Sequence, residues 1–206
     1  MREERFDRLT GLDIYDPATN PWKRAEPMKH ARHSLAAAFG DDGKLYVFGG
    51  CACRGSIPLY SPGNAAEKSV ATAEAEAQKH AVAETEVYDP KTDAWSTAPP
   101  MRTPRMLFAA APGADGKIYV IGGQTFWGGE PLANVDVYDP ATKRWSRGPS
   151  LRIGRVGHTA VTTGDGTIWV VGGSASTPSV AEIARVMAGD KGGPTTSVEL
   201  LKADPR

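Results

Sequence analysis

One short apolar segment occurs three times in this chain and has the same boundaries each time. The copies are Gly43–Gly50, Gly116–Gly123 and Gly166–Gly173. Each is rich in β-branched and aromatic residues, follows a turn and ends in a glycine pair. This pattern predicts a buried strand that is too short to be a helix. Paired glycines allow positive φ angles, so they mark where the chain leaves the sheet.

Several residue types repeat with the same spacing, first 73 and then 50 residues, which predicts a unit of about 50 residues. The first copy carries an insert of 23 residues between its glycine pair and its tyrosine. The repeated positions are Gly49, Gly122 and Gly172; Gly50, Gly123 and Gly173; Trp22, Trp95 and Trp145; Tyr15, Tyr88 and Tyr138; and Asp42, Asp115 and Asp165.

Each unit is predicted to contain four strands. In the central unit, Met106–Pro112 forms a first strand, and Asp115-Gly116 is a pair typical of tight hairpin turns. Ile118–Ile121 is the second strand, and Val135–Tyr138 alternates as a third. A final short strand contains Trp145. Such units cannot bury their faces alone, so we expect them to pack against one another.

The glycine pairs, the Tyr-Asp-Pro segments and the regularly spaced tryptophans resemble the kelch repeat. The resemblance implies an all-β fold, a kelch-type β-propeller with four-stranded blades arranged around a channel. The repeat-like units are 28–97, 101–147 and 151–201, preceded by strands of another blade at 11–24. Closed propellers have about four to eight blades. About three blades therefore predict an incomplete propeller, or copies that associate through open blade edges.

Two long loops, 51–83 and 174–196, interrupt the repeat. Residues 64–83 have a helix-favouring composition, with Asn64 as an N-cap. Ser179–Glu182 has a capping-box pattern, which predicts a short helix containing Ile183, Val186 and Met187.

Composition excludes several classes of partner. Lys+Arg and Asp+Glu are both 24, so the formal net charge is zero. We therefore expect neither nucleic-acid nor membrane-surface binding. The sequence contains no apolar run of membrane-spanning length and no secretory signal pattern. These features predict a single soluble, cytoplasmic domain.

Three arginines open the first strand of their units, each 17 residues before a glycine pair. They are Arg32, Arg105 and Arg155. Antiparallel pairing would place them beside the glycine pairs and both long loops, on one face. Guanidinium groups suit carboxylates and phosphates, and the resemblance implies that this face receives acidic peptide motifs. The alternative is a structural role, in which the arginines bind backbone carbonyls or stack between blades.

Histidines and cysteines offer weaker candidates. His33 and His158 lie near the inner strands and are included in the predicted ligand face, although hydrogen-bonded strand histidines are the alternative. His30 and His80 are expected in exposed loops. Cys51 and Cys53 are weak metal candidates, since a site needs more ligands than two thiols. A redox-active disulfide or two ordinary loop thiols are the other readings.

The function predicted from these residues is binding. The chain would be a scaffold that recognises a protein partner or an acidic ligand, with no cofactor, no metal and no catalytic residues. One alternative is a carbohydrate-active enzyme resembling galactose oxidase or sialic-acid epimerase, using the same arginines with His33 or His158. No converging acid/base set or copper site marks that enzyme in the sequence. The other alternative is a truncated fragment without activity of its own.

Overall fold

The computed structural model of this protein describes residues 9–52, 81–126 and 128–176, together with the backbone of 198–202. Every regular element in these ranges is a strand. In chain order, the strands are β1 Leu12–Tyr15, β2 Trp22–Ala25, β3 Ala36–Phe39, β4 Leu45–Phe48, β5 Thr85–Asp89, β6 Ala94–Ala98, β7 Ala109–Pro112, β8 Ile118–Ile121, β9 Val135–Asp139, β10 Arg144–Arg147, β11 Thr159–Thr162, β12 Thr167–Val171 and β13 Val198–Lys202.

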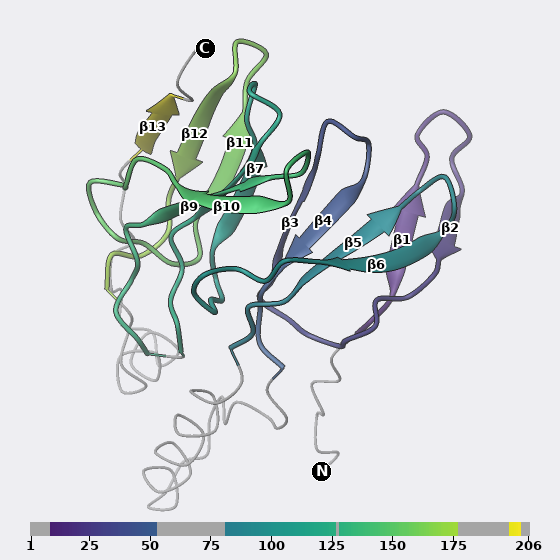
Figure 1. Ribbon diagram of the computed structural model, residues 1–206, viewed down its shortest axis with the longest axis horizontal. Coiled ribbons are helices and arrows are strands. Elements are labelled where there is room, and N and C mark those ends of the chain that lie inside the picture. Colours follow the sequence, from purple (N-terminus) through teal and green to yellow (C-terminus); the bar gives the residue numbers. More distant parts are fainter. Residues whose placement is uncertain (1–8, 53–80, 127, 177–197, 203–206) are drawn as a thin grey trace, which may run out of the picture.

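The strands form four antiparallel sheets, and the predicted all-β fold is confirmed. Two sheets have four strands, in the orders β3-β4-β5-β6 and β7-β8-β9-β10. We call them blade 1 and blade 2. Blade 3 has the strands β11-β12-β13, and β1-β2 forms a separate hairpin. The first strands of the three blades lie next to one another, since β7 contacts both β3 and β11. Figure 1 shows the blades arranged side by side, with the β1–β2 hairpin beyond blade 1.

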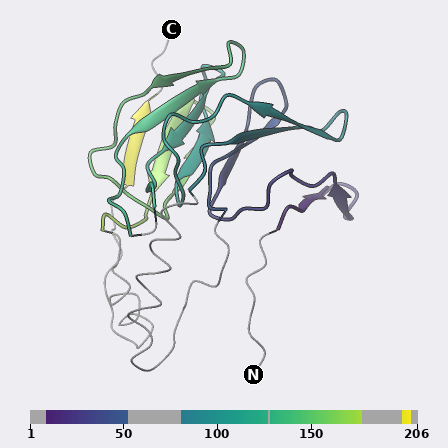
Figure 2. The ribbon, with the colours of Figure 1, turned by 60° about the horizontal axis from the view of Figure 1, so that its bottom comes forward.

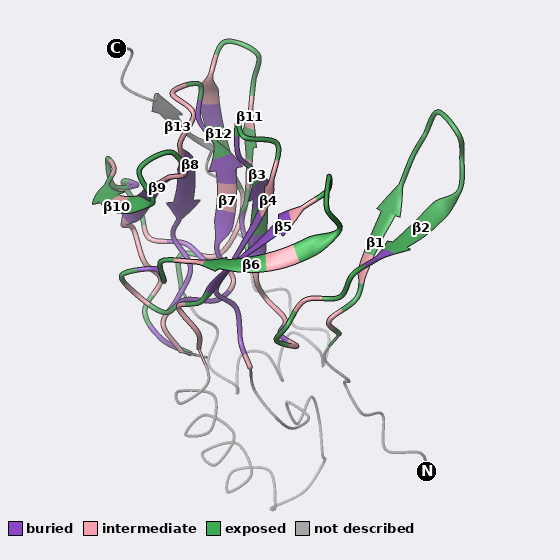
Figure 3. Ribbon diagram, turned by 45° about the vertical axis from the view of Figure 1, so that its right-hand side comes forward, coloured by how far each residue is buried: buried purple, intermediate pink, exposed green. Residues whose placement is uncertain are grey.

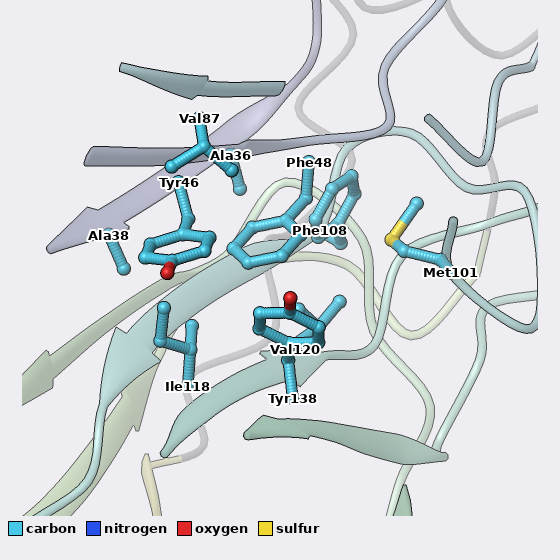
Figure 4. Packing of buried hydrophobic residues seen from close by; sticks show 10 residues of the cluster. All are labelled: Ala36, Ala38, Tyr46, Phe48, Val87, Met101, Phe108, Ile118, Val120 and Tyr138. Atoms are coloured by element: carbon cyan, nitrogen blue, oxygen red, sulfur yellow. The ribbon is translucent and has the colours of Figure 1, made fainter. Parts of the chain in front are cut away.

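Each blade buries apolar side chains against the next blade, as the repeat pattern predicts. Between blades 1 and 2, Tyr46 and Phe48 of β4 meet Tyr138 of β9, with ring centroids 5.5 and 6.2 Å apart. Ile118 and Val120 of β8 complete this cluster, which Figure 4 shows from close by. Side chains of this size contribute about 1.5–3 kcal/mol each when fully buried. Packing between blades is therefore a main source of stability.

Hydrogen bonds between backbones join the blades in a regular way. Gly50 N donates to Arg105 O of the next blade at 2.9 Å, and Gly123 N donates to Arg155 O at the same distance. These glycines have φ angles of 97° and 89°. A Cβ on Gly50 would lie 2.6 Å from His33 O, so both the backbone conformation and the space require glycine here. The glycine pairs therefore fit the role predicted for them.

The first strand of the central unit is shorter than predicted. The prediction was 106–112, whereas β7 covers only Ala109–Pro112. Met106 forms an isolated bridge with Gln124, and Leu107 interrupts the strand with a φ angle of 54°. The corresponding residues of the other units, Ser34 and Gly157, also have positive φ. The interruption is therefore part of the repeat rather than a local irregularity.

The prediction of a helix over residues 64–83 is wrong for its last three residues. Residues 81–83 are extended, because Ala81 bridges to Cys51 and Val82 N donates to Gly50 O at 3.0 Å. The remainder of this prediction, and the short helix predicted after Ser179, lie outside the described residues.

Candidate functional site: the connection face

One face of the blades carries the long connections, and we call it the connection face. It contains the ends of β4, β8 and β12, the starts of β5 and β9, and the segments that lead into β3, β7 and β11. The pairing of Phe48 with both Ala36 and Thr85 places these three strand ends together. In Figure 2 this face is at the lower side of the blades.

Arg105 is fully buried beneath this face and is bound within its own blade. Its guanidinium donates to Asp136 Oδ2 at 2.5 Å and to Gly122 O at 3.0 Å. Both members of the Arg105–Asp136 pair are inaccessible, with side-chain exposures of 0% and 1%. Burial lowers the pKa of Arg105, while the charge of Asp136 opposes that shift. The pair therefore joins the start of the first strand to the third strand.

The other two arginines lie in the same place in their blades. Arg32 is 3% exposed, donates to Glu84 O at 3.2 Å and forms an ion pair with Glu86 Oε1 at 3.1 Å. Arg155 is 1% exposed and donates to Gly172 O at 3.0 Å. These contacts are those of the structural alternative, in which the arginines bind backbone carbonyls. Direct ligand binding by the three guanidinium groups stays a prediction.

The two histidines of the predicted ligand face have different environments. His33 is partly buried, and its Nδ1 lies 2.9 Å from Ser34 Oγ. His158 is 8% exposed, and its Nε2 lies 3.1 Å from Ile121 O of the preceding blade. Burial, with a smaller contribution from the charge of Arg155, lowers the pKa of His158 to about 4. His158 therefore carries a neutral ring at neutral pH, and its ligand role stays a prediction.

Cys51 follows the first glycine pair, is fully buried and forms a disulfide. Cys53 and His80 lie outside the described residues. His30 is exposed as expected, and its Nδ1 lies 3.2 Å from Glu86 Oε1. In the described parts of the chain, no three His, Cys, Asp or Glu residues are grouped in a way that could hold a metal ion.

A second set of cations, not singled out in the sequence, is exposed on the connection face. Lys29, Arg102 and Arg152 lie three residues before the buried arginines, and all three are exposed. Their positions differ by 73 and 50 residues, so the repeat spacing that located the buried arginines contains this set as well. The spacing alone could not show which of the two basic residues in each segment is exposed to solvent.

The opposite ends of the blades are rich in aspartate. The turn between the first two strands of each blade contains an aspartate that accepts a backbone N–H, as Asp42 does from Lys44 at 3.2 Å. The outer hairpins add further carboxylates. The residues in question are Asp16, Asp41, Asp42, Asp89, Asp93, Asp115, Asp139 and Asp165.

Repeated four-stranded sheets that pack through their first strands define a β-propeller segment, and comparisons with known proteins identify the kind of repeat. The family model of the kelch motif matches residues 105–152. That range runs from Arg105 through the four strands of blade 2 to the start of the next unit. The predicted kelch repeat is therefore confirmed.

Two curated relatives also contain this repeat. The kelch repeat and BTB domain-containing protein 12 of Danio rerio is 29% identical over 125 residues, which are 58% of this chain and 17% of that protein. The protein of the same name from Homo sapiens is 29% identical over 128 residues, 60% of this chain and 18% of its own length. The chain thus corresponds to less than a fifth of either relative. Among the described residues, no helix is long and apolar enough to cross a membrane.

Proposed function

We propose that this chain is a protein-binding module whose connection face recognises an acidic segment of a partner protein. The observation that carries the proposal is the set of exposed cations at one repeat position, Lys29, Arg102 and Arg152. The segment that leads into the first strand of each blade thereby carries one exposed basic residue at the same repeat position. Charges arranged in this way favour an extended, negatively charged partner and increase its association rate.

The buried arginines support this surface from below. Arg32, Arg105 and Arg155 fix the segments from which the exposed cations project, through the hydrogen bonds to Glu84, Gly122 and Gly172. Fixing a segment before binding reduces the conformational entropy that binding would otherwise cost. In this proposal the buried arginines, together with His33 and His158, position the ligand face. Glu84 and Glu130 are local acids on the same face, and they limit how many carboxylates a partner could present there.

The test uses a fluorescein-labelled polyglutamate peptide and measures its binding by anisotropy at low salt. The triple variant Lys29→Glu, Arg102→Glu, Arg152→Glu should bind about tenfold more weakly, since exposed ion pairs contribute about 0.2–1 kcal/mol each. The matched control reverses three exposed cations remote from the connection face, Lys23→Glu, Lys91→Glu and Arg144→Glu. Equal losses in both triple variants would show a general effect of net charge and refute the proposed face.

A further inference from the structure

The described strands contain equal numbers of inner and outer strand pairs. The inner pairs, which hold the first two strands of a blade, are β3–β4, β7–β8 and β11–β12. The outer pairs are β5–β6, β9–β10 and β1–β2. The third outer pair, β1–β2, lies beyond blade 1, whereas the third inner pair, β11–β12, is in blade 3 at the other end of the row of blades (Figure 1). These two pairs therefore do not form one blade within a single chain. Three blades are too few to bring these ends together, since closed propellers have about four to eight.

The β1–β2 hairpin is already placed as the outer half of a blade. Met28 N donates to Thr10 O at 2.8 Å, and the equivalent bonds elsewhere are Met101 N to Ala83 O and Leu151 N to Ala133 O, at 2.7 and 2.8 Å. Tyr15 and Trp22 have ring centroids 5.2 Å apart, close to the 5.3 Å between Tyr88 and Trp95. The hairpin therefore has the geometry of a blade that lacks its two inner strands, and it is largely exposed (Figure 3).

The outward side of blade 3, which we call the trailing face, exposes positions that are buried in the other blades. Val161, Trp169 and Val171 are 53%, 39% and 39% exposed. Their counterparts in blade 2 are at most 5% exposed and those in blade 1 at most 7%, because the following blade covers them. These counterparts are Ala111, Tyr119 and Ile121 in blade 2, and Ala38, Tyr46 and Phe48 in blade 1.

The glycine pair of blade 3 shows what is missing from the trailing face. A Cβ on Gly49 would meet Met101 and Arg105 of blade 2, and a Cβ on Gly122 would meet Arg155 and His158 of blade 3. At Gly172, no atom of the described residues lies within 4 Å of the same position. At Gly49 and Gly122, this position contacts the segment that leads into the first strand of the next blade. Blade 3 has the same surface beside Gly172, and no described segment covers it.

Blade 1 presents the complementary surface, which we call the leading face. Ala110 and Ala160 of blades 2 and 3 pack against the core of the preceding blade, whereas the equivalent Ala37 is exposed. Phe39 is 56% exposed on the same side of β3. Met28, at the position of Met101, is only partly buried. The leading face therefore has the residues that the trailing face of another copy would need.

We propose that two copies of this chain dock head to tail, the trailing face of each against the leading face of the other. In this arrangement the β1–β2 hairpin of one copy pairs with β12 of the other and completes its third blade. The three inner and three outer pairs of the described strands are then all used, and two copies form a ring of six blades. This inference does not depend on the proposed ligand of the connection face.

The hairpin would replace β13 at the edge of β12. β13 now pairs with β12 so that Glu199 lies opposite Val170. In blades 1 and 2 the same register position holds Glu86 and Asp136, opposite Val47 and Val120. In β1 that position is Asp13, so the hairpin brings an equivalent acid to the blade of Arg155. It also brings the tyrosine–tryptophan pair of the complete blades, where β13 has Leu201.

The first test measures molar mass by light scattering over a dilution series of the full chain. We expect twice the mass of one chain for the parent protein. Trp169→Lys on the trailing face and Phe39→Lys on the leading face should each give the monomer. Both positions are exposed, so these variants should keep the fold, which circular dichroism checks. The control Ile153→Lys changes another exposed apolar residue, 47% exposed, outside both faces and should stay dimeric.

A second measurement separates strand exchange from simple contact. Backbone amides of β1 should exchange slowly with deuterium in the parent dimer and quickly in Trp169→Lys. A parent chain that is monomeric at every concentration overturns the proposal. Loss of the dimer in Trp169→Lys but not in Phe39→Lys would show a symmetric contact between trailing faces, and this also overturns it. A dimer whose β1 amides stay unprotected refutes the exchange of strands.

Discussion

At the scale of single residues, the buried arginine is the feature that most directly links sequence to structure. Arg105 and Asp136 lie 31 residues apart in sequence and join the segment before β7 to β9, a strand that does not pair with β7. Two buried charges are costly unless each compensates the other. The pair is therefore a test of whether these arginines serve the fold.

Arg105→Met should destabilise the protein by about 3–5 kcal/mol, because Asp136 would remain buried without its cation. The double variant Arg105→Met, Asp136→Leu should recover most of this loss, since an apolar pair of similar volume often replaces a buried ion pair at little cost. Urea denaturation measures both. If the double variant is as unstable as the single one, the pair is not the source of the effect.

The sequence predicted where the arginines lie but not how they are used. Their spacing placed them correctly at the entry to the inner strands. Their partners had a signal of their own, because Glu86 and Asp136 each stand two residues before a repeated tyrosine. A guanidinium group before the first strand can point inward to such an acid or outward to solvent. The outcome depends on which side of β5 or β9 carries the carboxylate. Composition and spacing do not contain that information.

At the scale of elements, the outer hairpins show how one turn accepts different residues. Asn20, Asp93 and Lys143 occupy the same repeat position, with φ angles of 65°, 52° and 56°. Asn and Asp adopt this left-handed conformation more readily than Lys does. In addition, Asn20 and Asp93 accept hydrogen bonds from Tyr15 and Tyr88, at 2.6 and 2.8 Å. The turn of blade 2 therefore has the least favourable residue of the three.

Lys143→Asn should stabilise the protein by about 1 kcal/mol, through lower backbone strain and an added acceptor near Tyr138. Thermal unfolding measures the gain. Lys143→Ala is the matched control, since it removes the same charge while keeping an unfavourable residue in the turn. A gain of the same size in Lys143→Ala would assign the effect to charge instead.

The predicted strand boundaries were most accurate where apolar runs ended in glycine pairs. They were least accurate where an apolar run continued through a residue that interrupts the strand. Arg105–Pro112 reads as one apolar strand after its arginine, yet Leu107 breaks it in the left-handed region. Leucine rarely adopts this conformation, so the central unit alone does not predict the interruption. Gly157 at the equivalent position of the third unit is the one residue type that could indicate it. Tertiary hydrogen bonds hold it there, since Leu107 N donates to Ser34 O and Gly157 N to Leu107 O, at 3.1 and 2.8 Å.

At the scale of the whole molecule, stability should depend on contacts between neighbouring blades, and His158 reports on one of them. Its ring lies between blades 2 and 3, beside Gly122 and Ile121. The folded pKa of about 4 lies below the ordinary value of 6.5. Between these values the unfolded chain binds the proton more strongly, so stability falls as the pH decreases from about 6.5 to about 4.

This histidine should contribute a loss of up to about 3 kcal/mol across that pH range. The measurement is the free energy of unfolding at a series of pH values, by urea titration. His158→Gln cannot gain the proton, so its stability should change less over the same range. Parallel curves for the two proteins would show that the histidine is not the group that titrates.

The repeat spacing predicted the blades and their packing, because periodic glycines, tyrosines and tryptophans report directly on a stacked sheet architecture. It did not predict which surfaces would be left uncovered. Val161 and Val171 resemble their buried counterparts in character, and only the arrangement of the neighbouring blade distinguishes them. Exposure of this kind is a property of position in the array rather than of residue type.

The bonds between blades have a direction. At both junctions between the described blades, the second glycine of one blade donates to the arginine carbonyl of the blade that follows, as Gly50 does to Arg105 and Gly123 to Arg155. The donating and accepting faces of a blade therefore differ, so growth by addition of blades has a polarity, like that of a filament with a plus and a minus end. Such growth stops when the curvature of the row brings the last blade against the first, because a closed ring of blades has no free end.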